Sequence, residues 1–334
     1  MNRPFYLITV IFITVFLFGG CTLKKDKNVK VGFLMHALDR ERWENDRDFL
    51  VQKVEELGGT VDVKIADNDA NKQLAQAKEM LANGVNVLVV VPVDQFAAAE
   101  IVNQAHAHDV KVISYDRLIK NCKLDYYVST DNVEIGALQA SYLTTIRPNG
   151  NYALIGGAGG DNNSQLLYLG QRNELQPLVE KGDIHIVYNE FTDHWGEEEG
   201  YEHALKIFAL PEKVDAIIAA NDAIAMGVIR AMEEKGITNV LLAGMDADLR
   251  NLQEIVAGHQ TCTVYKPYDK LATTTAELAV KLAECEECEN TFQTVSNGTM
   301  LVPTVFHNGM IVNKENLKLT VISEGYQREE EVYN

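Results

Sequence analysis

From residue 29 onward, short apolar runs alternate with longer stretches in which apolar positions recur every three or four residues. Residues 31–35 form an apolar run of strand length, and the stretch behind it carries Leu50, Val54 and Leu57 before a glycine pair. That spacing predicts a helix with one apolar face that ends at glycine. Further runs, each expected to form a strand, lie at 61–65, 85–91, 110–115, 152–155, 184–191, 214–220 and 240–243.

The strands fall into two series that meet near residues 126–131, and both series have the same order of elements. Repeated strand and helix units predict parallel sheets covered by helices. A chain of 334 residues with 46% hydrophobic content also exceeds what one small core organises. We therefore expect an α/β fold of two doubly wound lobes with parallel sheets. The formal net charge of -18 works against nucleic acid as a partner, because phosphate binding needs clustered Lys and Arg.

The N-terminus is typical of an export signal. Arg3 precedes an almost purely apolar stretch at 5–18, which is short for a membrane-spanning helix. Residues 17–21, Leu-Phe-Gly-Gly-Cys, resemble the bacterial lipobox, in which the cysteine is lipidated and becomes the new N-terminus. We expect a lipoprotein signal peptide at 1–20 and a tether at 21–28. A lipid on Cys21 would anchor the protein to a membrane, which places it in the periplasm or cell envelope. An ordinary signal peptide with an incidental cysteine stays open as the alternative.

Cys285 and Cys288 form a Cys-x-x-Cys motif among glutamates. A zinc site would need a second pair or histidine partners nearby, and the sequence has neither. An oxidising envelope favours a local disulfide between the two cysteines. The flanking acids work against a redox-active motif, because they raise the pKa of a thiol. Cys122 and Cys262 are expected to be small core or loop residues.

Clusters of polar residues follow several predicted strands, and ligands of open parallel sheets bind beyond the carboxyl ends of the strands. These residue types suit a sugar, whose hydroxyls donate and accept hydrogen bonds and whose C–H faces pack on aromatic rings. The candidates are the donors Arg42, Arg117 and Lys266, the acceptors Asp116, Asp161 and Asp246, the amides Asn163 and Asn221, and the only two tryptophans, Trp43 and Trp195. The alternatives are that the tryptophans are ordinary core residues and that Asp116-Arg117 is a loop ion pair.

The sequence gives little support for catalysis, nucleotide binding or metal binding. No nucleophile and base stand in a pattern typical of catalysis, and no phosphate-binding loop is present. Residues 67–71 begin like a calcium loop, but Lys72 and Lys78 occupy the positions that require Gly and Glu. We therefore expect neither an enzyme nor a bound metal or other cofactor.

Seven blocks of residues recur in the order and approximate spacing of a known family. They are 40–43 with 46–48, 114–117, 156–157 with 161–163, 193–195, 220–223, 244–248 and 263–267. On these blocks the sequence, from Val29 to its C-terminus, resembles the sugar-binding type I periplasmic binding proteins. His36-Ala37 and Met245 depart from the family pattern, which has acidic residues and Gln at these places.

The resemblance implies that the donors, acceptors and amides named above bind sugar hydroxyls and that Trp43 and Trp195 stack on the ring. It implies three crossings between the lobes, near 130–132, 265–267 and 302–303. One lobe would then comprise 29–130 plus 266–302, and the other 131–265 plus 303–334. The implied function is binding of a monosaccharide, with D-xylose as the first choice of sugar, and its delivery to an ABC-type importer. The resemblance also implies that the protein is a monomer. The alternative is a xylose-sensing subunit that signals through a membrane histidine kinase or chemoreceptor.

Overall fold

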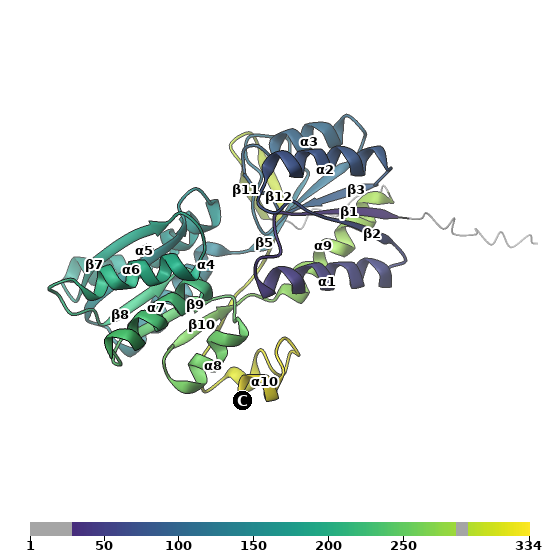
Figure 1. Cartoon of the computed structure of the whole chain (residues 1–334). Helices are drawn as coiled ribbons and strands as arrows, with labels where there is room; N and C mark the ends of the chain where they lie inside the picture. The colour runs from purple at the N-terminus through teal and green to yellow at the C-terminus, as the bar shows by residue number, and fades with distance from the viewer. Residues whose placement is uncertain (1–28, 285–292) are drawn as a thin grey trace, which may run out of the picture.

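The computed structural model describes residues 29–284 and 293–334, which form two α/β lobes (Figure 1). The sheet of the first lobe has seven strands, in the order β11 (Gln293–Ser296), β12 (Leu301–His307), β5 (Tyr126–Thr130), β4 (Lys111–Tyr115), β3 (Val87–Val90), β1 (Lys30–Met35) and β2 (Thr60–Ile65). Its helices are α1 (Glu41–Glu56), α2 (Ala70–Ala82), α3 (Ala99–His106) and α9 (Tyr268–Ala283). Only the edge pair β11–β12 is antiparallel in this sheet.

The sheet of the second lobe has six strands, in the order β13 (Met310–Val312), β10 (Cys262–Tyr265), β9 (Leu241–Met245), β8 (Ala216–Ala219), β6 (Gly150–Ala158) and β7 (Ile184–Thr192). Its helices are α4 (Asn132–Ile146), α5 (Asn162–Lys181), α6 (Glu197–Phe208), α7 (Asp222–Lys235) and α8 (Leu249–Ala257). All neighbours except β10–β13 are parallel. The expectation of two doubly wound lobes is confirmed. No helix of the described ranges is long and apolar enough to cross a membrane.

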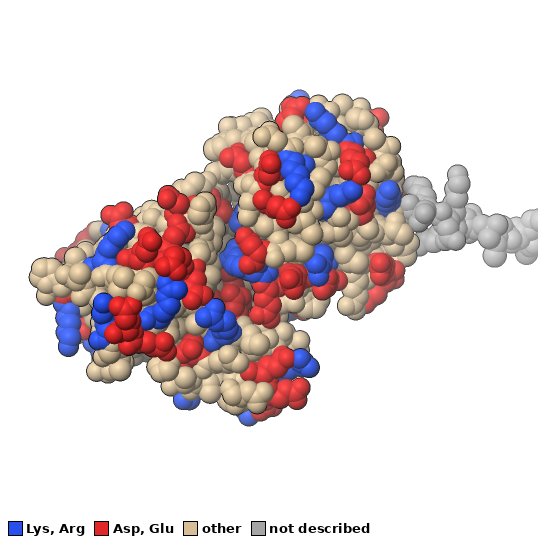
Figure 2. All heavy atoms as spheres, in the orientation of Figure 1, with Lys and Arg blue, Asp and Glu red and all other residues tan. Residues whose placement is uncertain are grey.

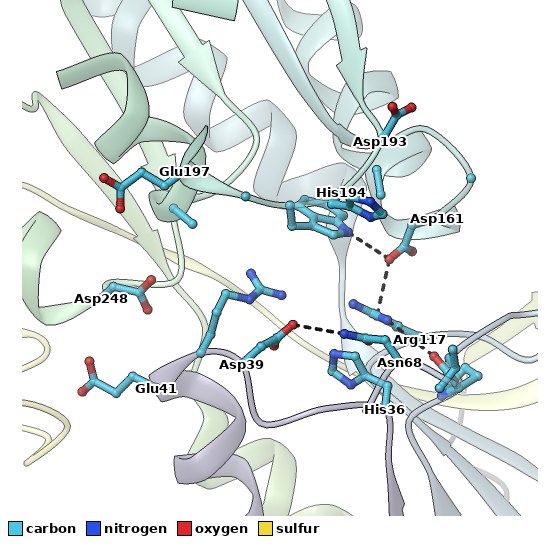
Figure 3. A pocket seen from close by; sticks show the side chains of 18 of the residues that line it. His36, Asp39, Glu41, Asn68, Arg117, Asp161, Asp193, His194, Glu197 and Asp248 are labelled. Carbon is cyan, nitrogen blue, oxygen red and sulfur yellow. Dashed lines mark hydrogen bonds and ion pairs between the residues drawn. The ribbon is translucent and has the colours of Figure 1, made fainter. Parts of the chain in front are cut away.

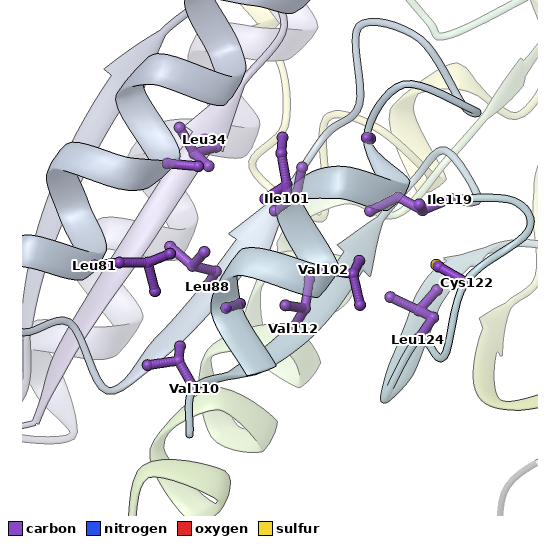
Figure 4. Close-up of a cluster of buried hydrophobic side chains, with 14 of the residues drawn as sticks. Leu34, Leu81, Leu88, Ile101, Val102, Val110, Val112, Ile119, Cys122 and Leu124 are labelled. Carbon is purple, nitrogen blue, oxygen red and sulfur yellow. The ribbon is translucent and has the colours of Figure 1, made fainter. Parts of the chain in front are cut away.

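Each sheet is buried on both faces, which explains the unbroken apolar runs of its central strands. In the first lobe, Leu34 and Leu88 pack with the residues of α2 and α3 in one core (Figure 4). Phe33 and Val89, their neighbours along the same strands, pack with α1 and α9 in the other core. The β3 run Val-Leu-Val-Val is therefore fully buried, whereas β2 at the edge is only half-buried.

The chain passes between the lobes three times. The first two crossings, between β5 and α4 and between β10 and α9, lie where the sequence places them. The third lies at 308–309 and not at 302–303, because the apolar alternation continues beyond Pro303 and β12 pairs with β5 as far as His307. Residues 303–307 therefore belong to the first lobe.

A C-terminal segment, residues 313–334, packs beside the second crossing and ends in α10 (Glu329–Val332). The ring of Tyr326 lies 4.9 Å from that of Tyr265 and 5.6 Å from that of Tyr268, measured between centroids. Gln327 donates from Nε2 to Oε1 of Glu41 at 2.9 Å. Because Glu41 begins α1 of the first lobe, the C-terminal segment connects both lobes at the hinge.

Candidate ligand-binding site

A cleft of about 930 Å³ lies between the lobes, where the carboxyl ends of both sheets face each other (Figure 3). Beside the hinge is a second, much smaller space of about 20 Å³, called the inner cavity here. It is lined by Arg40, Arg42, Trp43, Asp116, Arg117, Asp161, Asn163, Trp195, Met245, Asp246 and Lys266. Four of these residues also line the cleft, so the two spaces adjoin.

Strand ends and helix starts supply the side chains of the inner cavity. Asp116 follows β4 and Asp246 follows β9, and each donates its backbone N–H to the neighbouring strand, to Val128 at 2.8 Å and Val264 at 2.9 Å. Both aspartates have positive φ, 59° and 110°, which is unusual for residues other than glycine. Such strain persists only where the surrounding structure holds it, and here it turns a carboxylate from each lobe into the cavity.

Arg42 is the centre of a buried charge network. Its Nη2 lies 2.7 Å from Oδ1 of Asp116, its Nε 3.3 Å from Oδ2 of Asp46, and its Nη1 3.6 Å from Oδ1 of Asp246. Lys266, from the second crossing, places Nζ 3.9 Å from Asp116 and 3.8 Å from Asp246. Burial alone would raise the pKa of Asp116, but Arg42 and Lys266 outweigh burial and hold that pKa well below its usual range.

Asp46 supports this network from behind. It lies in the second turn of α1, fully buried, and accepts hydrogen bonds from Arg42 and from the Tyr115 hydroxyl. Burial raises the pKa of Asp46 to about 6, although Arg42 and the Tyr115 hydrogen bond both act to lower it. Asp46 therefore orients Arg42, although burying its carboxylate away from water is unfavourable.

The two tryptophans have different surroundings. Trp43 is 1% exposed, and the Arg42 guanidinium lies over it at 4.0 Å from the ring centroid. Trp195 is partly exposed and donates from Nε1 to Oδ2 of Asp161 at 3.3 Å. Its ring packs directly on Gly157, where a Cβ atom would come within 2.2 Å of the indole. Trp195 therefore presents the more accessible aromatic surface to a ligand.

Polar contacts join the lobes across the inner cavity. Asn163 donates from Nδ2 to the carbonyl oxygen of Asp116 at 3.1 Å and to its Oδ2 at 3.3 Å. Arg117 Nε lies 3.4 Å from Asp161 Oδ2, and Arg40 Nη1 lies 3.5 Å from Asp246 Oδ2. All of these residues except Arg40 are predicted sugar contacts, and in this structure they bind one another.

Nine of the ten residues that the sequence predicts as sugar contacts line the inner cavity. Asn221 does not: its Oδ1 accepts from the Ile224 N–H at 3.0 Å, which caps α7, and its Nδ2 lies 3.4 Å from the Trp195 carbonyl oxygen. The sequence missed Arg40, which lies two residues before Arg42 in the same block. The position of Arg40 beside Arg42 in the sequence could have indicated that it lines the same cavity.

Clusters of three or more His, Cys, Asp or Glu residues that could hold a metal ion are absent from 29–284 and 293–334. Cys122 and Cys262 are buried thiols in the two lobes. Cys21 and the pair Cys285 and Cys288 lie outside the described residues, so the lipid and the disulfide stay predictions. The arrangement as a whole can bind a polar solute by hydrogen bonds without a reactive group.

Two lobes that face each other across a polar cavity beside their hinge define a class of proteins that bind a small solute by closing on it. The chain belongs to the periplasmic binding protein family, because residues 31–287 match the family described as "Periplasmic binding protein domain". It is 41% identical to the D-xylose-binding periplasmic protein of Escherichia coli K12 over 312 residues, 92% of this chain and 93% of that protein. The protein of the same name from Haemophilus influenzae is 39% identical, with the same coverage.

Solved structures agree with this assignment. A carbohydrate transporter solute-binding protein from Chloroflexus aurantiacus, in complex with D-glucose, matches with a TM-score of 0.85 and 28% identity, covering 90% of this chain and 97% of that one. An ABC transporter solute-binding protein from Clostridium phytofermentans, with bound β-D-glucose, matches with a TM-score of 0.82 and 25% identity, covering 91% and 99%. The two D-xylose-binding relatives are periplasmic sugar-binding proteins and not enzymes, the two solved structures are solute-binding proteins with bound glucose, and this chain is a binding protein of the same family.

Proposed function

We propose that the protein binds D-xylose in the inner cavity and delivers it to an ABC-type importer. The observation that carries the proposal is the convergence of nine predicted contacts, from both lobes and the hinge, on one buried cavity. Carboxylates there accept from sugar hydroxyls, and guanidinium, ammonium and amide groups donate to them. Charge-assisted hydrogen bonds are about 1.5–3 kcal/mol each, so a few give tight binding.

The size of the inner cavity suggests how binding and closure are coupled. A cavity needs about 10–15 Å³ of such space to hold one water molecule, so the inner cavity, at about 20 Å³, has room for about one water and not for a pyranose. The lobes must therefore separate at the Arg117–Asp161 and Asn163–Asp116 contacts and close again with sugar hydroxyls between these groups. Closure with sugar in place would give the permease a distinct shape to recognise.

The choice of sugar is tested by calorimetric titration with D-xylose, D-ribose, L-arabinose, D-glucose and D-galactose. We expect D-xylose to bind at least about tenfold more tightly than the others, a difference of about 1.4 kcal/mol. A clear lead for a hexose would contradict the choice of D-xylose alone. Flat titrations with all five sugars would contradict sugar binding itself.

Delivery is tested in the source bacterium by deleting the gene. Uptake of labelled D-xylose at low concentration should be lost, while transcription induced by xylose continues. Intact uptake with lost induction would contradict delivery and favour a sensing role.

We also propose that the protein is exported and anchored through a lipid on Cys21, on the strength of the N-terminal sequence motif. A Cys21→Ser variant should appear in the soluble envelope fraction, whereas the wild type stays with membranes and incorporates labelled palmitate. Equal fractionation of the two proteins would contradict the anchor.

A further inference from the structure

His36 is a buried polar residue that the network of the inner cavity does not use. It follows the last residue of β1, is 2% exposed, and lines the cleft on the side of the first lobe (Figure 3). Its Nδ1 has no hydrogen-bond partner among the residues that the structure describes. Buried polar atoms are almost always paired, so an unpaired one calls for a partner that binds there.

The imidazole lies between the cleft and the inner cavity. Its ring packs edge-on against Trp43, with centroids 4.4 Å apart at 78°, and Trp43 lines the inner cavity. Arg117 and Asp161 line both spaces. His36 therefore adjoins the wall of the inner cavity on the side that faces the cleft.

The chemistry of His36 suits a neutral hydroxyl. Burial first, and then the guanidinium groups of Arg117, Arg40 and Arg42, hold the pKa of His36 well below its ordinary value. A neutral imidazole has one nitrogen that donates and one that accepts. A half-turn of the ring exchanges Nδ1 with a carbon in the same plane, so either edge of the ring can offer a nitrogen.

We propose that His36 is a further ligand-contacting residue, whose imidazole hydrogen-bonds a hydroxyl on the cleft side of the bound sugar and so helps to select the sugar. The inference rests on the proposed function, because it needs a sugar in the inner cavity. It adds a contact on the first lobe that is separate from the charged pairs.

Three substitutions separate hydrogen bonding from packing. His36→Phe keeps an aromatic ring against Trp43 but has no ring nitrogen, whereas His36→Asn and His36→Gln keep a hydrogen-bonding group and lose the ring. We expect His36→Phe to weaken D-xylose binding by about fivefold to tenfold, the size of one neutral hydrogen bond. We expect His36→Asn or His36→Gln to recover most of the loss, although their melting temperatures fall more than that of His36→Phe.

Deoxy sugars identify the hydroxyl. Calorimetry with 2-deoxy-, 3-deoxy- and 4-deoxy-D-xylose should show one analogue that wild type binds more weakly than D-xylose and that His36→Phe binds as well as D-xylose. Full affinity of His36→Phe for D-xylose would overturn the inference and leave the proposed function standing. Loss of affinity in proportion to lost melting temperature, in all three variants, would make His36 a packing residue only. Flat wild-type titrations would overturn both proposals together.

Discussion

The inner cavity and the outer cleft are both rich in charge, but they use it differently. In the inner cavity, Arg42, Asp116, Asp246 and Lys266 are at most 2% exposed, and each lies within 4 Å of an opposite charge. Around the cleft, acidic side chains border the groove between the lobes (Figure 2). One of them is Asp193, which lines the cleft and is exposed to solvent (Figure 3). Removing one member of a buried pair leaves a desolvated charge, whereas an exposed charge is screened by water. The comparison predicts that substitutions in the inner cavity change both affinity and stability, whereas substitutions around the cleft change little.

Asp116→Ala should have the largest effect. It removes a proposed sugar acceptor and leaves Arg42 and Lys266 with one carboxylate fewer. We expect D-xylose binding to become undetectable by calorimetry and the ligand-free protein to lose about 3–5 kcal/mol of unfolding free energy. Asp116→Asn is the matched control and should retain more stability than Asp116→Ala. If ligand-free Asp116→Ala were as stable as wild type, the inner cavity and the cleft would not differ in how their charges affect stability.

Arg117→Ala tests the border between the two spaces. The Arg117 side chain is 15% exposed and pairs with Asp161, which is similarly exposed. We expect binding to weaken by about tenfold, from the loss of one charge-assisted hydrogen bond, with little change in the melting temperature of the ligand-free protein. A large loss of stability would place Arg117 with the buried network instead.

The pH dependence of stability tests Asp46. Its pKa is raised to about 6 in the folded protein from an ordinary value of 3.8, so the folded state binds the proton more tightly. The resulting stabilisation is fully present below pH 3.8 and is lost as the pH rises through about 6. The free energy of unfolding of Asp46→Asn, relative to wild type, should therefore increase between pH 3.8 and about 6 and level off above that. A constant difference measured by urea unfolding would contradict the raised pKa.

Asp193→Asn should have the smallest effect. The residue is exposed at the cleft, and its side chain pairs with no other residue of 29–284 and 293–334. We expect the affinity for D-xylose to change by less than about twofold and the melting temperature to stay the same. A tenfold loss of affinity would show that the cleft, and not only the inner cavity, binds the sugar.

Local pattern was enough to predict most of the fold. The apolar run of β3 and the spacing of Leu50 and Val54 in α1 each depend on a few neighbouring residues, and the structure confirms both elements. The third crossing could not be placed in this way. Pro303 is a usual strand breaker, but here it lies at the antiparallel edge pair of β11 and β12, and only pairing with β5 shows where the strand ends.

The position of the candidate residues at the strand ends could be predicted for a similar reason, whereas the sugar contacts themselves stay predictions. Polar blocks after strands converge because the ends of parallel strands share one edge, so Asp116 and Asp246 could be foreseen. The role of Asn221 as the cap of α7 and the unpaired nitrogen of His36 depend on distances across the fold. The support of Arg42 by Asp46 needs the same knowledge, since one turn of helix does not reveal that both side chains are buried.

The three crossings also determine the order in which the lobes can be completed during synthesis, which begins at the N-terminus. Strands β6 to β10 and helices α4 to α8 lie in one continuous stretch, 132–265, which lacks only β13 of its sheet. The first lobe must wait for α9 and for β12, which arrives after all of that stretch. Although domains usually fold in order of synthesis, the second lobe has five of its six strands before α9, β11 and β12 of the first lobe have been made, and the half-built first sheet must stay free of aggregation meanwhile.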